Sequence, residues 1–223
     1  MFRLSSISHS MPLLRRVYIK GAMLMVIASI IGGCASTNAV QRQQYDFGLV
    51  DTKDVQGHQA EAGVMSGKKP FTIALAEIAV APPLDSTAMW YRLNYDNSQQ
   101  LKAYANARWS TPPAQLFAQR LKIQSVSSGL QLMTTNDSIN GVPVLRIEID
   151  EFSHVFNTLS DNHAHVSLRA MLTKGNVLLG QRQFTRQVAG KTADAAGGAH
   201  AMQEACDLVI NDIQQWLTQV TTK

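Results

Sequence analysis

Three histidines, His154, His163 and His165, have the residue type and spacing that most resemble a metal site. His163 and His165 are two residues apart, so on a strand they share one face. If the preceding turn places Phe156 opposite His163, His154 lies across from His165, and three imidazoles on one face could hold zinc. A shift of one residue in this register would move His154 to the other face, and no acidic or cysteine fourth ligand is positioned. We therefore predict solvated strand histidines and no metal site.

Two short motifs resemble those of enzymes but lack their context. Residues 189–192 (AGKT) lie between a predicted strand and helix, as in a phosphate-binding loop, but Thr185 stands where the first glycine is required. Residues 66–69 (SGKK) match S-x-x-K, but they precede Pro70 in a loop instead of opening a helix. No nucleophile with a base and an orienting group stands out elsewhere. The absence of such a set does not exclude an enzyme, but it makes an enzyme less expected.

Cys34 follows an apolar run that is typical of a signal peptide. Residues 21–31 (GAMLMVIASII) are apolar or small, basic residues precede them, and two glycines separate them from the cysteine. Eleven such residues suit a signal-peptide core, whereas a membrane-spanning helix needs roughly 20. The sequence I-G-G-C resembles a bacterial lipobox, in which the cysteine is acylated, with palmitate among the usual acyl groups, and becomes the new N-terminus. We predict a lipoprotein signal peptide over residues 1–33 and lipid attachment at Cys34; whether Met1 or Met11 is the start is left open.

Removing residues 1–33 changes the charge of the chain. The full sequence carries 20 basic and 16 acidic residues, with a pI near 9.2. Four basic residues and no acidic ones precede Cys34, so the mature chain carries 16 of each sign. This neutrality, without a Lys/Arg cluster among aromatics, argues against nucleic-acid binding. Ala35 rather than aspartate follows the cysteine, which by the usual lipoprotein sorting rule favours the outer membrane, facing the periplasm. Two or three acyl chains are enough for stable anchoring.

The mature chain is long enough for one domain and a tether. We expect residues 34–44 to be the acylated N-terminus and a polar tether, and residues 45–220 to be a single domain. Alternating or apolar runs predict strands over 45–50, 71–80, both arms of 88–109, 130–135, 142–156, 163–173 and 177–188. Helices are predicted over 112–126, with Thr111 as cap, and over about 193–220, with Thr192 as cap. The predicted fold is an α/β two-layer sandwich: a mostly antiparallel or mixed sheet with two helices packed on it.

The last predicted helix has apolar residues at alternating steps of four and three. This stripe favours a helix packed on the sheet over a coiled-coil seam, because it covers fewer than four heptads. Cys206 lies in the stripe and is expected to be a small buried hydrophobe. With Cys34 acylated, it has no disulfide partner.

The segment 88–109 is expected to form a hairpin that turns at Asp96–Gln99. Pairing Tyr91 with Ala105 sets large residues against small ones across the ladder. The candidate partner-binding surface is the opposite, polar face, with Trp109 at its end, because Tyr, Trp and Arg are the residues that anchor interfaces. Its members are Arg92, Tyr104, Arg108 and Trp109. The alternative is that the aromatics fill the core and the arginines pair locally.

Three ordered blocks together resemble the ABC-type transport auxiliary lipoprotein family, the lipoproteins associated with MCE-domain lipid or solvent transport systems. They are MWYRLNYDNSQQLKAYANARWSTPPAQLFAQRL (89–121), LRIEIDEFSHVFNTLSDNHAHVSLRAML (145–172) and QRQFTRQVAGKTADAAGGAHAMQEACDLVINDIQQWL (181–217). YDFG (45–48) and the lipobox extend the resemblance to nearly the whole mature chain.

The resemblance implies a periplasm-facing, non-enzymatic and cofactor-free auxiliary subunit that helps a transporter hand a hydrophobic substrate between membranes. The implied partners are an MCE-domain protein and the ABC permease and ATPase, with the membrane reached through the N-terminal acyl chains; a homo-oligomer is left open. The alternative function is a structural envelope lipoprotein that binds peptidoglycan or an outer-membrane protein. An enzyme acting on envelope polymers would be a third class.

Overall fold

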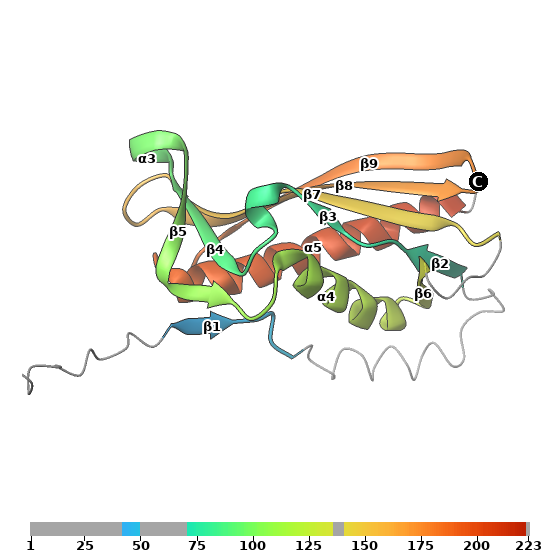
Figure 1. Ribbon diagram of the computed structural model, residues 1–223, viewed down its shortest axis with the longest axis horizontal. Coiled ribbons are helices and arrows are strands. Elements are labelled where there is room, and N and C mark those ends of the chain that lie inside the picture. The colour runs from blue at the N-terminus through green and yellow to red at the C-terminus, as the bar shows by residue number, and fades with distance from the viewer. Residues whose placement is uncertain (1–41, 50–70, 136–140, 222–223) are drawn as a thin grey trace, which may run out of the picture. The chain divides into compact units, whose positions relative to one another are not determined.

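The computed structural model describes residues 42–49, 71–135 and 141–221, which all belong to one compact unit (Figure 1). Cys34, the leader, most of the predicted tether and the S-x-x-K motif lie outside these residues. The strands are β1 (Gln43–Tyr45), β2 (Phe71–Leu75), β3 (Ala79–Val80), β4 (Ala88–Leu93), β5 (Ser98–Trp109), β6 (Leu130–Thr134), β7 (Val144–Phe156), β8 (Asn162–Lys174) and β9 (Val177–Ala189). The helices are α3 (Asn94–Asn97), α4 (Pro113–Ser127) and α5 (Ala195–Thr221), with a 3₁₀ turn, η1, at Pro82–Leu84.

Strand β7 organises the nine-stranded mixed sheet. One of its edges pairs with β8 along nearly its whole length, and β8 pairs with β9, which confirms the predicted three-strand antiparallel meander. Three strands pair in parallel with its other edge, one after another along β7, namely β2, β3 and β4. Outside them, β6 pairs with β2, β5 with β4, and β1 with the end of β5.

The two long helices form a layer on one face of this sheet (Figure 1). The sheet presents to them the alternating residues Leu145, Ile147 and Ile149, all buried as the sequence predicts. The facing stripe of α5 is equally buried, and Cys206 within it has no solvent exposure. The predicted two-layer sandwich is therefore confirmed. The apolar face of the helix, with its period of 3.6 residues, packs on the apolar face of the strands, with their period of 2.0, in one core. No helix in the described part of the chain is long and apolar enough to cross a membrane.

The predicted hairpin forms, but its register is wrong near the tip. Arg92 pairs with Leu101 and Tyr91 with Lys102, where the expected partner of Tyr91 was Ala105. Residues Asn94–Asn97 form the helical turn α3, so the strands meet three residues out of the predicted register. A bulge between Ala88 and Trp90 restores the predicted alignment at the base, where Ala88 pairs with Arg108.

Three predicted elements have different boundaries. The run 71–80 is two strands, since its middle carries the exposed Glu77 and the chain changes its place along β7 there. Helix α4 begins at Pro113 with Pro112 as N-cap, and Thr111 lies before it. The first strand is Gln43–Tyr45 instead of 45–50.

Candidate functional site

The four residues of the predicted partner surface do not share one open face. Trp109 is 1% exposed and packs edge-on against Phe47 and Phe152 in the core, so its placement on a surface is wrong. The guanidinium of Arg92 donates to Glu151 at 2.9 Å. Arg108 lies against the side-chain amide of Gln44 on β1 and donates to its oxygen when that amide is oriented with the oxygen toward the guanidinium. These contacts agree with the alternative that the arginines pair locally; whether Arg92 and Arg108 also contact a partner stays a prediction.

The fourth residue, Tyr104, belongs to a polar network that crosses the sheet. Its hydroxyl lies 2.8 Å from Nδ1 of His154, a side chain with no solvent exposure. On the other side of the ring, Nε2 lies 2.7 Å from Oδ1 of Asn162. The Asn162 amide nitrogen donates to the carbonyl of Ser160, so Oδ1 must be its acceptor. His154 therefore carries its proton on Nε2 and accepts the Tyr104 hydroxyl at Nδ1.

Burial keeps this network neutral. It lowers the pKa of His154 below the usual histidine value, with the nearby charge of His163 acting in the same direction. It also raises the pKa of Tyr104 well above the ordinary tyrosine value. A neutral phenol and a neutral imidazole that satisfy each other suit a structural network better than acid–base catalysis near pH 7.

The start of α5 is built to pack closely against this network. A carboxylate oxygen of Asp194 accepts the backbone N–H of Gly197 at 2.8 Å and the hydroxyl of Thr192 at 2.8 Å, so Asp194 is the cap and the predicted cap, Thr192, supports it. A Cβ on Gly198 would overlap the imidazole of His154. The D-A-A-G-G run therefore caps the helix and leaves room for a buried histidine.

The three histidines do not gather on one face. The register pairs Phe156 with Asn162, one residue from the alignment that the zinc alternative requires. The prediction of a solvated His154 is therefore wrong: its side chain points into the helix-covered face and has no solvent exposure. His163 and His165 lie on the opposite face with their rings 6.4 Å apart. Within the described ranges, no three His, Cys, Asp or Glu side chains are placed to hold a metal ion.

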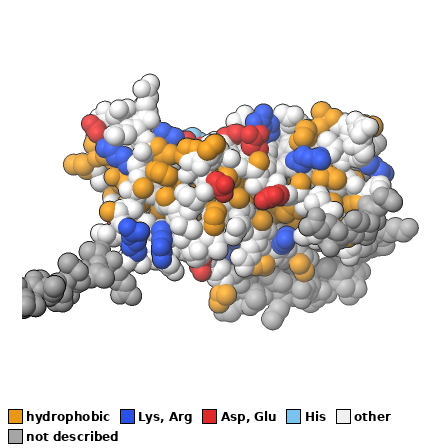
Figure 2. Space-filling view, in the orientation of Figure 1, with side chains coloured by type: hydrophobic (Ala, Val, Ile, Leu, Met, Phe, Trp, Pro, Cys, Tyr) orange, Lys and Arg blue, Asp and Glu red, His pale blue; other side chains and the backbone are white. Residues whose placement is uncertain are grey.

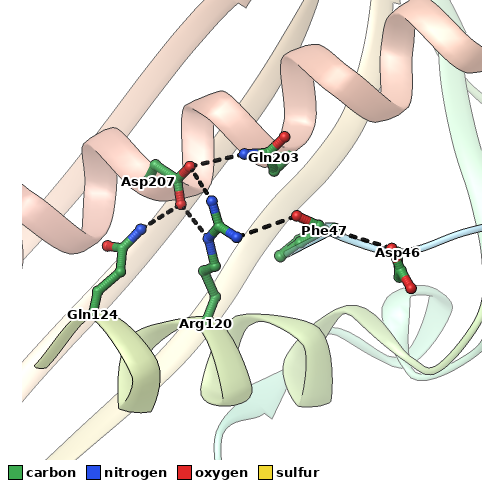
Figure 3. A network of polar contacts seen from close by, with 7 residues as sticks. Asp46, Phe47, Arg120, Gln124, Gln203 and Asp207 are labelled. Carbon is green, nitrogen blue, oxygen red and sulfur yellow. Dashed lines mark hydrogen bonds and ion pairs between the residues drawn. The ribbon is translucent and has the colours of Figure 1, made fainter. Parts of the chain in front are cut away.

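A second network joins α4, α5 and the chain that follows β1 (Figure 3). Arg120, only 6% exposed, forms a bidentate pair with Asp207, with contacts of 2.6 and 2.7 Å. Gln124 and Gln203 donate to the same carboxylate. The remaining guanidinium nitrogen donates to the backbone carbonyl of Phe47 at 3.2 Å. Bidentate geometry with extra donors is what a buried ion pair requires to be stable.

We call residues Gln43–Leu49 the strap. Its strand β1 adds in parallel to the end of β5, with Tyr45 opposite Trp109. The ring of Phe47 is 5% exposed and lies 5.8 Å from that of Trp109 and 6.3 Å from that of Phe152. The strap is therefore fixed by backbone pairing, an aromatic anchor and the clamp of Arg120.

The depressions near these networks do not suit an apolar ligand. The one beside the strap and α4 has a volume of about 70 Å³, too small for an acyl chain. The larger, of about 610 Å³, lies on the meander and is lined by Asp150, Arg169, Gln181, Arg182 and Gln183. On the face shown in Figure 2, Lys and Arg side chains are scattered among Asp and Glu.

Sequence reasoning missed Arg120, Asp207 and Asn162. A signal for Arg120 was available, because it lies between Phe117 and Leu121 on the apolar face of α4. A charge in an apolar stripe indicates a buried partner. Nothing local indicates that this partner is Asp207, which is 87 residues away.

The comparison with family models decides the affiliation of the chain. The model for the ABC-type transport auxiliary lipoprotein component matches residues 56–214, most of the sequence. The chain belongs to this family. No curated protein matches this auxiliary lipoprotein by sequence.

Solved structures share the fold at low sequence identity. A crystal structure of a Xanthomonas campestris protein is 19% identical, with a TM-score of 0.60, and the match covers 70% of this chain and 91% of that one. An uncharacterized protein of known structure is 12% identical, with a TM-score of 0.61, over 79% of this chain and 99% of that one. At these identities the likeness shows the sheet-and-helix architecture alone.

Proposed function

We propose that this lipoprotein is a non-enzymatic auxiliary subunit of an MCE-type ABC transport system that moves lipid or another hydrophobic substrate across the cell envelope. It is anchored in the outer membrane through acyl chains on Cys34 and faces the periplasm. The observation that carries the proposal is the match to the transport auxiliary family over residues 56–214. The lipobox at Cys34 and Ala35 after it support the anchor and its membrane.

The described part of the chain supports a contacting role over a carrying one. Of two depressions formed by described residues, one is very small and the other is lined by charged and amide side chains, whereas a site for acyl chains is apolar. In the His154 and Arg120 networks, the polar side chains bond to one another and so join strands and helices of the domain. The subunit therefore acts by holding a transporter component in place while the cargo passes elsewhere.

The contact surface that we propose is the tip formed by α3 and the turn between β7 and β8. Asn94 donates to Asn157 and joins the two. Tyr95 on α3 is 48% exposed and Leu159 in the turn is 81% exposed. Tyrosine is a residue type that anchors interfaces, and because hydrogen bonds hold the tip, its loops need little further ordering on binding.

The test is co-purification of the full-length lipoprotein from its native membranes, followed by mass spectrometry. The expected result is recovery of the ABC permease, the ATPase and the MCE-domain protein. Recovery of peptidoglycan or an outer-membrane protein without transporter components would overturn the function and support the structural alternative.

A double variant, Tyr95→Ser with Leu159→Ser, tests the tip. It should lose the transporter components with an unchanged melting temperature, since both side chains are exposed. Val177→Ser is the matched control, because Val177 is 62% exposed at the far end of the meander. Retention of the transporter by the double variant would reject the tip while leaving the function standing.

A further inference from the structure

The strap sets how far the domain can stand from its membrane. Cys34, the proposed lipid attachment, precedes the first strand residue, Gln43, by only nine positions. The eight residues between them span at most about 28 Å, whatever their conformation, because a chain extends at most about 3.5 Å per residue. The reach of the domain thus depends on whether the strap stays attached.

The contacts of the strap indicate that it stays attached. Three residues of β1 pair with β5, and the backbone N–H of Ser110 donates to the carbonyl of Tyr45 at 2.8 Å. Phe47 is buried among the core aromatics, and its carbonyl is held by Arg120, which Asp207 fixes in turn. Peeling the strap would expose the Phe47 ring and leave Arg120 one acceptor short, and both changes are unfavourable.

A detached strap would change the reach greatly. In the described part of the chain, the next strand that could hold it is β2, which begins at Phe71. The link to Cys34 would then be 36 residues long, with a limit above about 100 Å. Attachment of the strap therefore decides whether the domain is held close to the lipid by a short link or can move far from it on a long one.

We infer that the strap end of the domain, marked by β1 and Ser110, is the face turned to the lipid surface, within about 28 Å of it. This rests on the acylation of Cys34 proposed above. The opposite end of the meander, where the β8–β9 turn carries Val177, points away from that surface. Bound in this way, the domain does not cross the periplasm, and a transporter component must come to it.

The direction follows from the length of the meander. Phe47 packs on Phe152, and eight residues of β7 separate Phe152 from Val144, which lies beside the β8–β9 turn. At about 3.3 Å per residue, this places the turn roughly 26 Å beyond the strap along β7. The link between Cys34 and Gln43, of about 28 Å at most, is attached at the strap end, so that end stays nearer to the lipid on average.

The experiment uses the full-length lipidated protein in vesicles of phosphatidylethanolamine and phosphatidylglycerol that contain an acceptor-labelled lipid. A donor dye is placed on Ser110→Cys or on Val177→Cys, both at exposed positions. Energy transfer to the membrane should be roughly twofold higher from position 110 than from 177, because of the difference in distance along β7. Equal transfer from the two positions, or higher transfer from 177, would overturn the inference.

Two further variants test the strap itself on the Ser110→Cys background. Phe47→Ala should lower transfer from position 110, and Leu49→Ala, at a strap residue that is 98% exposed, should not. If Phe47→Ala fails to fold, a flexible insertion of about 20 residues after Thr37 serves instead. It lengthens the link between Cys34 and the strap without changing the core, and it should lower transfer in the same way. Unchanged transfer after this insertion would overturn the inference.

Cys34→Ser separates this inference from the proposed function. It should abolish vesicle association if the anchor is acyl-linked. Vesicle association that persists in Cys34→Ser would reject the anchor, whereas loss of association with equal transfer from both dyes in the parent would reject only the orientation.

Discussion

Asn162 fixes the orientation and the tautomer of the buried His154 ring. The amide oxygen of Asn162 accepts from Nε2 of His154 at 2.7 Å, and the imidazole has no contact with solvent. The other ring nitrogen is engaged by Tyr104 as an acceptor. A second proton on the ring would remove that acceptor, so the folded state favours the neutral ring.

The free energy of unfolding should fall on acidification. Burial holds the pKa of His154 below its ordinary value of about 6.5, so the unfolded chain takes up a proton first as the pH decreases. The contribution of His154 is complete above about pH 7.5 and is lost progressively below about pH 6.5. Urea unfolding at several pH values measures it. The His154→Gln variant should be less stable at neutral pH, and its free energy of unfolding should decrease less on acidification. The control His200→Gln, at an exposed position, should show the same pH dependence as the parent. An equally steep decrease in His154→Gln would mean that another group causes it.

Removal of the Arg120 guanidinium should destabilise the protein strongly. Arg120→Met keeps the volume of the side chain but leaves the carboxylate of Asp207 without its bidentate partner and the Phe47 carbonyl without its donor. We expect a loss of about 3 kcal/mol in the free energy of unfolding. Arg169→Met, at the exposed pair with Glu148, is the control and should cost less than about 1 kcal/mol. Similar losses for both variants would contradict a special role for the buried pair.

Gly198→Ala should be destabilising although it replaces glycine with alanine inside a helix. Alanine is normally favoured at such a position by about 1 kcal/mol. At Gly198, however, the added Cβ would overlap the His154 ring, and overpacking of this kind costs roughly 1–3 kcal/mol. Thermal unfolding of Gly198→Ala, His154→Ala and the double variant tests the cause. The effects should be less than additive, because the second change removes the overlap.

The Cys206 thiol should be unreactive in the folded protein. It has no solvent exposure, so a reagent cannot reach it, and burial raises its pKa, so the reactive thiolate form is disfavoured. Mass spectrometry after maleimide treatment should show modification only in denaturant. Ser110→Cys provides an exposed thiol in the same fold and should react at once; equally rapid reaction of Cys206 in native buffer would show that α5 leaves the sheet.

The meander and the stripe of α5 could be predicted because their signals are local. Leu145, Ile147 and Ile149 alternate along one strand, and the apolar steps toward Cys206 follow helical spacing. Both periods are set by the geometry of the element itself. The burial of Trp109 could not be predicted in the same way, because it depends on Phe47 and Phe152, which lie far from it in the sequence.

Register was the main failure of the sequence interpretation. A single-residue difference in the β7–β8 turn decides whether His154 faces solvent or the core, and the turn residues do not specify it. The same applies to α3, where four residues that look like a simple turn form a helical one and displace the pairing of Tyr91. In the first case the signal lies far away in the sequence, at Gly198 of α5, which leaves room for the His154 ring.

The sharing of one edge of β7 by β2, β3 and β4 has a consequence for synthesis and export. These three strands are made before residue 144. Strand β2 can already pair with β6, and β4 with β5, but the edge that each of the three presents to β7 stays open until β7 is made. Until Val144–Phe156 has emerged, the earlier half of the domain has no place to complete its hydrogen bonds and remains exposed to wrong pairings. We therefore expect a truncation before β7 to aggregate instead of forming a smaller domain.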